Sequence, residues 1–313
     1  MNASRYNINN LAFALKNPSI ILGEINRVCT RFNSKYNKKY QSSNGIYIMD
    51  EDWDNLILLD GCRFDTFSDV NHIGGELESR VSRASESLPF MKENFEGKEF
   101  HDTIYITANP YAYNLNSSIF HKIINVYETG WNDDYQTVMP ETVTKKLIEI
   151  NESYPNKRLI AHYMQPHVPF IGKKGSEMAQ VGFGDRASKS THKETSAWKL
   201  LQYGLESKKK VKEAYRENLR IVLKDVENVL EHLDGKSVVS SDHGNLMGER
   251  LSPIPVRGYG HPRYLYNREL RTVPWLVVQR NGRKDIVSER PERNPTNKDH
   301  DEIEDRLQAL GYE

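Results

Sequence analysis

The 313-residue chain has only two cysteines, Cys29 and Cys62. Two cysteines can form one disulfide at most, and a chain of this length does not need a bridge in order to fold. Cys62 also lies two residues after a candidate site residue, Asp60, where pairing would be awkward. We therefore expect both cysteines to be free thiols in a reducing compartment.

Long apolar runs and an excess of one charge are missing as well. No segment approaches the roughly 20 uninterrupted apolar residues of a membrane span, and the first residues lack the pattern of a secretion signal. The chain has 43 Lys plus Arg and 43 Asp plus Glu. This balance argues against a nucleic-acid binder, but it leaves room for a local basic pocket. The expected location is the cytoplasm.

Composition divides the chain into three parts. Residues 1–45 are predicted to form an N-terminal helical extension and linker: residues 8–32 are amphipathic around a break at Pro18, and residues 33–45 are polar. The helix is expected to pack on the domain. The alternative is that it makes a peripheral contact with the inner face of the membrane. Residues 46–287 would form the catalytic domain, with 171–209 as a Lys-rich lid or insertion. Residues 288–313 would be a tail with a short helix.

Short apolar runs alternate with helical patterns along the body of the chain. Strands are predicted at 55–60, 103–107, 158–164, 237–240 and 273–278, and helices from Pro140 and along 215–233. This order predicts an α/β fold, a three-layer sandwich with a mainly parallel central sheet. Function in such sheets collects at the carboxyl ends of the strands. Asp60, His167, Asp242 and His243 all fall there.

Two acidic positions stand at predicted strand ends. Asp60 precedes Gly61, and Asp242 stands beside His243 and before Gly244. Carboxylates with imidazoles suit Zn²⁺ or Mn²⁺, whereas carboxylate-rich sets suit Mg²⁺ or Ca²⁺. Neither motif is specific alone, but their common position favours one divalent metal ion.

Candidate nucleophiles and substrate contacts lie in other loops. Residues 80–90 offer three serines beside two arginines, and a serine needs a base or a metal to become a nucleophile. His167 follows Pro166 after a strand, and His261 lies in the Gly-Tyr-Gly-His-Pro loop. His162 lies within a strand and is expected to be a core histidine.

The order of these pieces resembles the alkaline phosphatase and sulfatase superfamily. The residues 165–170, Gln-Pro-His-Val-Pro-Phe, are similar to the Pro-His-x-Pro-Phe loop of its sulfatase-like and phosphoglycerol-transferase-like members. The resemblance spans residues 53–280, and the chain is similar to archaeal sulfatase-like proteins. The motifs that carry it are Leu59-Asp60-Gly61-Cys62-Arg63, Ser87-Leu88-Pro89, and Ser241-Asp242-His243-Gly244 followed by Gly260-His261.

The resemblance implies an alkaline-phosphatase-like fold and a set of roles. Asp60, Asp242 and His243 would hold the ion. Ser87 would complete its coordination sphere and act as the nucleophile, with Ser85 as the alternative. His167 and His261 would contact substrate oxygens or protonate the leaving group, and Arg63 or Arg83 would neutralise developing charge.

The chain departs from the family pattern at two places. Met91 stands where sulfatases that convert their nucleophile to formylglycine carry an arginine, so an unmodified serine is expected. Gln165 and Pro169 stand in the loop where two-zinc phosphatases carry an Asp and a His, so one ion is expected.

The predicted function is thus that of a metal-dependent hydrolase or transferase of phosphate or sulfate esters. One alternative is a sulfatase acting on glycan sulfate esters. The other is a catalytically silent member that binds a glycan or a partner. The expected substrate is a small anionic ester, a glycan or a lipid-linked molecule, and nucleic acid is not an expected partner.

Overall fold

The computed structural model describes residues 18–41, 44–178, 196–292 and 300–312. Its centre is a seven-stranded sheet in the order β2-β11-β8-β1-β7-β3-β4. Only β11 runs antiparallel to its neighbours, whereas the other adjacent strands are parallel. The strands are β1 (Asn55–Leu59), β2 (Glu76–Val81), β3 (Phe100–Thr107), β4 (Phe120–Asn125), β7 (Arg158–Tyr163), β8 (Gly235–Ser240) and β11 (Thr272–Arg280).

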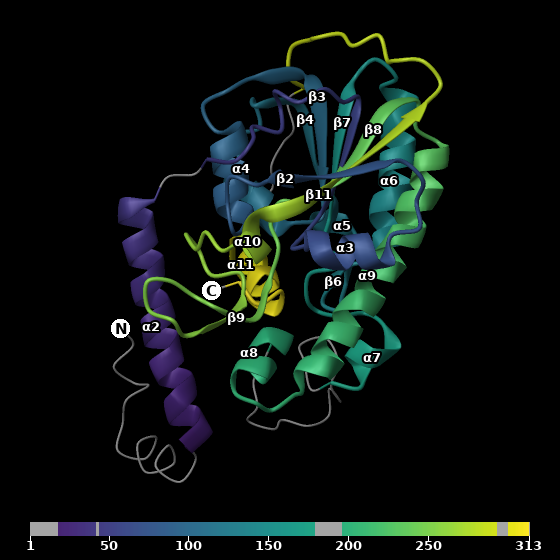
Figure 1. Cartoon of the computed structure of the whole chain (residues 1–313). Coiled ribbons are helices and arrows are strands. Elements are labelled where there is room, and N and C mark those ends of the chain that lie inside the picture. Colours follow the sequence, from purple (N-terminus) through teal and green to yellow (C-terminus); the bar gives the residue numbers. More distant parts are fainter. Residues whose placement is uncertain (1–17, 42–43, 179–195, 293–299, 313) are drawn as a thin grey trace.

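Helices cover both faces of this sheet (Figure 1). On one side lie α3 (Phe64–Val70), α6 (Pro140–Ser153) and α9 (Lys208–Glu231). On the other lie α4 (Ser87–Phe95), the 3₁₀ helix η2 (Pro110–Asn114) and α11 (His300–Ala309), and both α4 and α11 contact η2. The predicted three-layer α/β sandwich with a mainly parallel sheet is confirmed.

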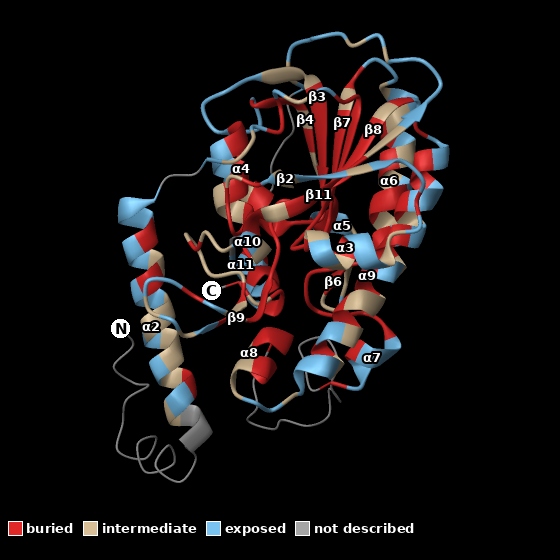
Figure 2. Ribbon diagram, viewed as in Figure 1, coloured by how far each residue is buried: buried red, intermediate tan, exposed pale blue. Residues whose placement is uncertain are grey.

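Burial explains why these segments fold as they do. All five residues of β1 are buried, as expected for a central strand covered on both faces. In α9, the apolar residues that recur at helical spacing are buried, among them Val211, Leu219 and Val226. The Ser207 side chain accepts a hydrogen bond from the backbone N–H of Lys210 and caps the helix. Figure 2 shows the buried residues concentrated in the sheet and on the inner helix faces.

The smaller elements lie beyond the carboxyl ends of the central parallel strands (Figure 1). They are the helices α5 (Val126–Thr129), α7 (Lys173–Ser176), α8 (Ala197–Gln202) and α10 (Arg268–Arg271), and the short antiparallel pairs β5 (Trp131–Asn132) with β6 (Thr137–Val138) and β9 (Leu246–Arg250) with β10 (Arg257–Gly260). Trp198 of α8 packs edge-on against Phe170 and Tyr215. This contact joins the described end of the predicted lid to the body. Residues 179–195 of that lid lie outside the described residues.

The prediction of a linker at residues 33–45 is wrong for residues 33–40. Helix α2 (Pro18–Tyr40) continues through it. Asn33 and Asn37, one turn apart, are both buried, and Phe32, Tyr36 and Tyr40 follow one another on another face. Polar composition suggested a linker, yet these polar residues form the face that packs on the domain. Residues 8–17 of the predicted amphipathic segment lie outside the described residues.

Two further expectations can be compared with the structure. Both cysteines are free, as predicted. Among the helices of the described ranges, none combines the length and apolar character needed to span a bilayer.

Candidate metal centre and adjoining cavity

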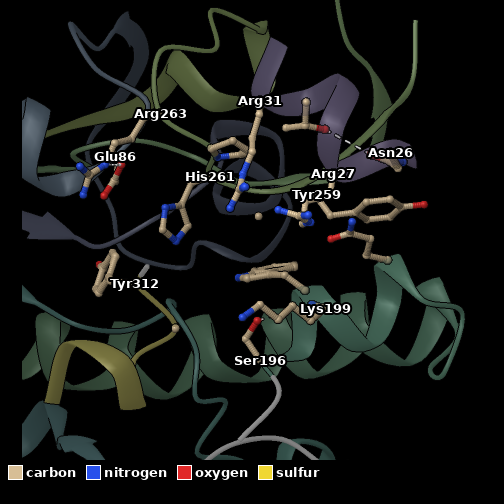
Figure 3. A pocket seen from close by; sticks show the side chains of 16 residues that line it. Asn26, Arg27, Arg31, Glu86, Ser196, Lys199, Tyr259, His261, Arg263 and Tyr312 are labelled. Carbon is tan, nitrogen blue, oxygen red and sulfur yellow. Dashed lines mark hydrogen bonds and ion pairs between the residues drawn. The ribbon is translucent and has the colours of Figure 1, made fainter. Parts of the chain in front are cut away.

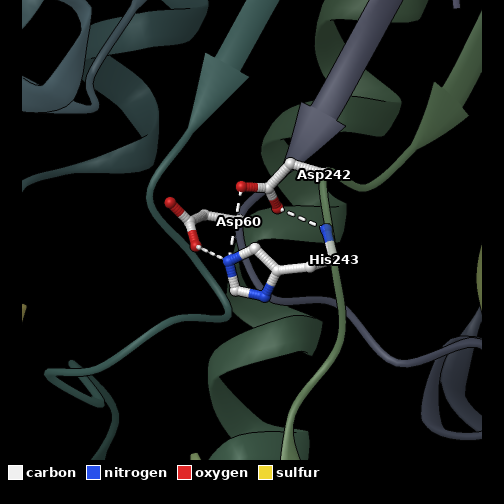
Figure 4. A group of neighbouring side chains, drawn as sticks. All are labelled: Asp60, Asp242 and His243. Atoms are coloured by element: carbon white, nitrogen blue, oxygen red, sulfur yellow. Dashed lines mark hydrogen bonds and ion pairs between the residues drawn. The ribbon is translucent and has the colours of Figure 1, made fainter. Parts of the chain in front are cut away.

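Two adjacent central strands bring the predicted metal ligands together. Asp60 directly follows β1, and Asp242 and His243 follow β8, which pairs with β1 in parallel. The three side chains converge at the carboxyl edge of the sheet (Figure 4). All three are fully buried, and their candidate ligand atoms lie within 4.8 Å of one another.

Two of the carboxylate oxygens have no hydrogen-bond donor in the described part of the chain. Asp60 Oδ1 and Asp242 Oδ2 are buried and accept no hydrogen bond from the described residues. They lie 3.6 Å and 3.4 Å from His243 Nε2. A buried polar atom without a partner is costly, and a buried carboxylate more so. A divalent cation held between these atoms would satisfy both oxygens and balance the two negative charges, so the residues fit the predicted ion.

The imidazole of His243 is oriented for the same role. Its Nδ1 lies 2.8 Å from the carbonyl oxygen of Gly244. A carbonyl can only accept, so Nδ1 carries the proton in the neutral ring and Nε2 offers its lone pair to the site. Burial alone would lower the pKa of His243, but Asp242 and Asp60 outweigh it and raise the pKa. Burial would raise the pKa of Asp242, but His243 and His162 lower it below its usual value.

The remaining oxygen of Asp242 is fixed by the backbone. Oδ1 accepts hydrogen bonds from the backbone N–H groups of Gly61, at 3.0 Å, and His243, at 2.8 Å. Gly61 has a φ of +65°, and a Cβ there would lie 2.6 Å from Asn245 Nδ2. A glycine is therefore required at the turn that follows Asp60.

Ser87 lies beside the three candidate ligands, and Ser85 does not. Ser87 is the first residue of α4 and is fully buried. Its hydroxyl donates to Asp60 Oδ2 at 3.1 Å and lies 3.4 Å from His243 Nε2. The Ser85 hydroxyl instead donates to the carbonyl oxygen of Pro262, at 3.0 Å. We call Asp60, Ser87, Asp242 and His243 the strand-end cluster.

His162 is only partly the satisfied core histidine that the sequence suggested. Its Nδ1 lies 2.8 Å from the Tyr105 hydroxyl. Its Nε2 is buried without a hydrogen-bond partner among the described residues, and it lies 3.7 Å from Asp242 Oδ2 and 3.9 Å from Asp60 Oδ2. A third unsatisfied group thus points into the strand-end cluster.

His167 and His261 form a pair next to the cluster. Their Nε2 atoms are 2.8 Å apart. His167 Nδ1 lies 2.7 Å from the Val168 carbonyl oxygen and must donate to it, so His261 donates through Nε2 and keeps a bare Nδ1. That Nδ1 has no partner in the described part of the chain. Burial lowers the pKa of both histidines, and that of His261 is further lowered by His243 and His167.

Neither candidate arginine joins the cluster. The guanidinium of Arg63 pairs with Asp65 and with Glu249, and it also donates to the Asn245 carbonyl oxygen. Arg63 lines a separate cavity of about 250 Å³. Arg83 donates to the Gly45 carbonyl oxygen and to Glu93. The structure thus gives no support to a charge-neutralising role at Ser87 for either residue.

Two further residues contact the cluster, Asn109 and Tyr312, and neither was predicted as a site residue. Asn109 donates to Asp60 Oδ2 at 2.7 Å, and the Tyr312 hydroxyl donates to the same oxygen at 2.8 Å. Tyr312 also lies 3.2 Å from Ser87 Oγ and stacks on His167 with an interplanar angle of 11°. Asn109 stands just beyond the carboxyl end of β3, so the strand-end rule could have found it. No pattern in the predicted tail pointed to Tyr312.

A cavity of about 260 Å³ adjoins the cluster (Figure 3). His261 and Tyr312 form part of its wall, and helix α2 contributes Arg27 and Arg31. Its other charged residues are Lys199, Arg263 and Glu86, and Arg263 is paired with Glu86. We call this space the α2 cavity. Its wall carries four cationic side chains and one carboxylate.

Comparison with known proteins finds similar folds at low sequence identity. No protein-family model and no curated protein matches the chain. The soluble domain of lipooligosaccharide phosphoethanolamine transferase A from Neisseria meningitidis shares 11% identity at a TM-score of 0.42, over 71% of this chain and 75% of that one. The periplasmic domain of EcEptC from Escherichia coli, in complex with Zn, shares 14% identity at a TM-score of 0.36, over 76% of each chain.

A third solved structure belongs to a candidate sulfatase from Bacteroides thetaiotaomicron. It shares 13% identity at a TM-score of 0.42, over 83% of this chain and 70% of that one. Likenesses at this level concern the fold alone. The expected closeness to archaeal sulfatase-like proteins stays a prediction.

Proposed function

We propose that this protein is a metal-dependent hydrolase or transferase of phosphate esters that uses Ser87 as its nucleophile. One observation carries the proposal. The atoms Asp60 Oδ1, Asp242 Oδ2 and His243 Nε2 converge in the interior, and the only serine of the 80–90 segment that reaches them is Ser87. A fold alone needs no such arrangement, because unpaired buried carboxylate oxygens destabilise it.

Asp60, Asp242 and His243 would hold the ion, with Ser87 as a further ligand. The mixed Asp and His donor set favours Zn²⁺ or Mn²⁺ over Mg²⁺ or Ca²⁺. When bound, the ion would lower the pKa of the serine hydroxyl and stabilise negative charge on a phosphoryl oxygen.

The surrounding residues position Ser87 for attack. Its hydroxyl proton is directed at Asp60 Oδ2, 3.1 Å away, and the same oxygen is held by Asn109 and Tyr312. Ser87 is fully buried, and its Oγ lies 3.2 Å from the hydroxyl of Tyr312, a residue that also lines the α2 cavity. Attack would form a bond from Ser87 Oγ to phosphorus and break the bond from phosphorus to the ester oxygen. The serine would lose its proton toward Asp60 Oδ2, and this loss balances the proton that the departing alcohol takes up.

The histidine pair would serve the second half of the reaction. His261 keeps a bare Nδ1, and its lowered pKa keeps the ring neutral near pH 7. It can accept a proton from a water or an alcohol that displaces Ser87 Oγ from phosphorus. His167 holds the ring in the required tautomer through the contact between their Nε2 atoms. Water as acceptor gives a hydrolase, and an alcohol gives a transferase.

The α2 cavity indicates an anionic substrate. Arg31 has no hydrogen-bond or ion-pair partner among the residues that the structure describes, and it faces the same space as His261 (Figure 3). Cationic walls next to a phosphoryl-transfer centre favour a substrate that carries further negative charge. We propose a small anionic ester, a glycan or a lipid-linked molecule as the substrate.

Replacing the nucleophile tests this function. The Ser87→Ala variant should lose turnover of an aryl phosphate monoester and diester panel by about 10⁴-fold or more, because no other hydroxyl occupies its place. Ser85→Ala is the matched control and should retain wild-type rates, since its hydroxyl contacts Pro262 instead. Full activity in Ser87→Ala, with the metal still bound, would refute the nucleophile.

Two alternatives are separated by simple assays. The sulfatase alternative retains the same cluster, and it would be favoured if aryl sulfate were turned over faster than aryl phosphate by the same preparation. The silent alternative predicts no turnover of any ester together with no uptake of a divalent ion. The fit of the unsatisfied oxygens to a cation argues against this second alternative.

A further inference from the structure

Helix α2 packs on the domain through a polar face. Asn33 exchanges two hydrogen bonds with the backbone of Ile254, both of 2.9 Å. Gly23 lies against the ring of Tyr203, where a Cβ would come within 2.4 Å of it. Lys38 lies over the ring of Tyr264 at 4.7 Å. The inner face of the helix is thus fixed by polar and close backbone contacts, which is the reverse of a usual surface helix.

The outer face of the same helix is apolar and exposed. Leu22 and Phe32, for example, are 67% and 52% exposed. Six of the ten large hydrophobic residues that are exposed in the described part of the chain lie on this one helix. At 3.6 residues per turn they share an arc of about 120°. We call them the apolar row: Leu22, Ile25, Val28, Phe32, Tyr36 and Tyr40.

Two lysines border the apolar row. Lys35 and Lys39 stand four residues apart and are both exposed. These two form the basic row. The only acidic residue of α2 is Glu24, which is paired with Arg27 and lies near the Tyr203 hydroxyl. Figure 2 shows α2 along one edge of the molecule, where this outer face is clear of the body.

We propose that the apolar row and the basic row of α2 dock on an anionic bilayer surface. An interfacial helix buries apolar and aromatic side chains at the level of the headgroups while Lys and Arg contact anionic lipids, and the rest of its surface stays polar. From Leu22 to Tyr40, α2 provides such a face about 27 Å long. A second copy of the chain fits less well, because it would bring another basic row against this one with no free carboxylate on either described helix.

The side of α2 opposite the apolar row faces the α2 cavity. Asn26, Arg27, Thr30 and Arg31 line the α2 cavity, which extends to His261. One helix would thus separate the bilayer from the cavity beside the strand-end cluster. This consequence rests on the proposed function, whereas the docking itself does not.

Vesicle binding by the full chain tests the docking without any need for activity. In flotation with vesicles of phosphatidylcholine and phosphatidylglycerol, we expect wild-type protein to float with the lipid, and to float less with pure phosphatidylcholine. The Ile25→Asp/Phe32→Asp variant should lose about tenfold or more in partitioning, because two apolar anchors are replaced by charges. Leu205→Asp/Val287→Asp is the matched control, since both residues are exposed elsewhere and should not matter.

The basic row is tested in the same assay. Lys35→Glu/Lys39→Glu should abolish the preference for phosphatidylglycerol, while Lys145→Glu/Lys224→Glu, an equal charge change on exposed positions of α6 and α9, should keep it. Thermal unfolding would show that each variant is folded. The proposal is overturned if wild-type protein does not float, if the α2 variants float as well as wild type, or if light scattering finds a dimer that the Ile25→Asp/Phe32→Asp variant loses. Failure of ester turnover with intact flotation would refute only the proposed function.

Discussion

The strand-end cluster and the α2 cavity are neighbours, but they are assembled in opposite ways. The cluster is fixed by the carboxyl ends of two adjacent parallel strands and by the first residue of α4. The cavity draws its wall from α2, from α8, from the loop after β10 and from the residues after α11. The cluster is fully buried and carries two carboxylates, whereas the cavity wall carries four cationic side chains and one carboxylate.

This difference indicates that the cluster would carry out the reaction and that the cavity would select the substrate. A site built on strand ends is held by the whole core, so its geometry is rigid and its residues can be tuned by burial. A site built from peripheral segments can vary in charge and shape without disturbing the sheet. We therefore expect substitutions in the cluster to affect metal binding and turnover, and substitutions in the cavity to affect mainly the choice of substrate.

The largest effect should follow from Asp242→Asn. The substitution removes one negative charge and one ligand from the cluster, so the affinity for a divalent ion should fall by about 100-fold or more and turnover should fall with it. Titration calorimetry with Zn²⁺ and Mn²⁺ measures the first and the aryl phosphate assay the second. Asp65→Asn, which touches Arg63 outside the cluster, is the control. If the affinity for the ion were unchanged in Asp242→Asn, Asp242 would not be a metal ligand.

A smaller effect is expected for Tyr312→Phe. The variant keeps the stacking on His167 and loses the hydrogen bond to Asp60 Oδ2, so turnover should fall by about 10-fold to 100-fold. The ion affinity should change less than in Asp242→Asn. Tyr111→Phe, whose hydroxyl contacts Glu86 and not Asp60, serves as the comparison. Identical kinetics in the two variants would argue that the Tyr312 hydroxyl has no part in positioning Asp60.

The smallest effect should come from the cavity. Arg31→Met should raise KM for an ester with a second negative charge by roughly 10-fold, and leave kcat and the ion affinity unchanged, because it removes only a binding contact. Lys35→Met changes the charge of the same helix outside the cavity and should leave KM unchanged. If Arg31→Met lowered kcat with an unchanged KM, the division between cluster and cavity would fail.

The sequence predicted the central strands of the sheet best, because each of them is a short apolar run. The apolar runs that end at Asp60 and at Ser240 predicted the strands, and parallel pairing then brings their ends together. Ser87 was placed by resemblance alone, since no spacing rule distinguishes it from Ser85. The structure distinguishes them, because only the Ser87 hydroxyl reaches Asp60.

What could not be predicted depends on packing between distant segments. Tyr312 reaches Asp60 across 252 positions of the chain, and no local pattern encodes that contact. Helix α2 was partly misjudged as a linker because its buried residues, such as Asn33 and Asn37, are polar. The edge strands β2 and β4 were not predicted. In β2, four of the six residues are polar and none is buried, so its sequence lacks the alternation of a half-buried strand.

We propose above all that the strand-end cluster holds a divalent ion and that Ser87 is a further ligand of this ion. Anomalous diffraction from crystals loaded with Zn²⁺ and soaked with vanadate tests it most directly. We predict one strong peak about 2–2.3 Å from Asp60 Oδ1, Asp242 Oδ2 and His243 Nε2, with Ser87 Oγ facing the vanadium atom. No peak at this position, or vanadate bound with Ser85 facing it, would contradict the account.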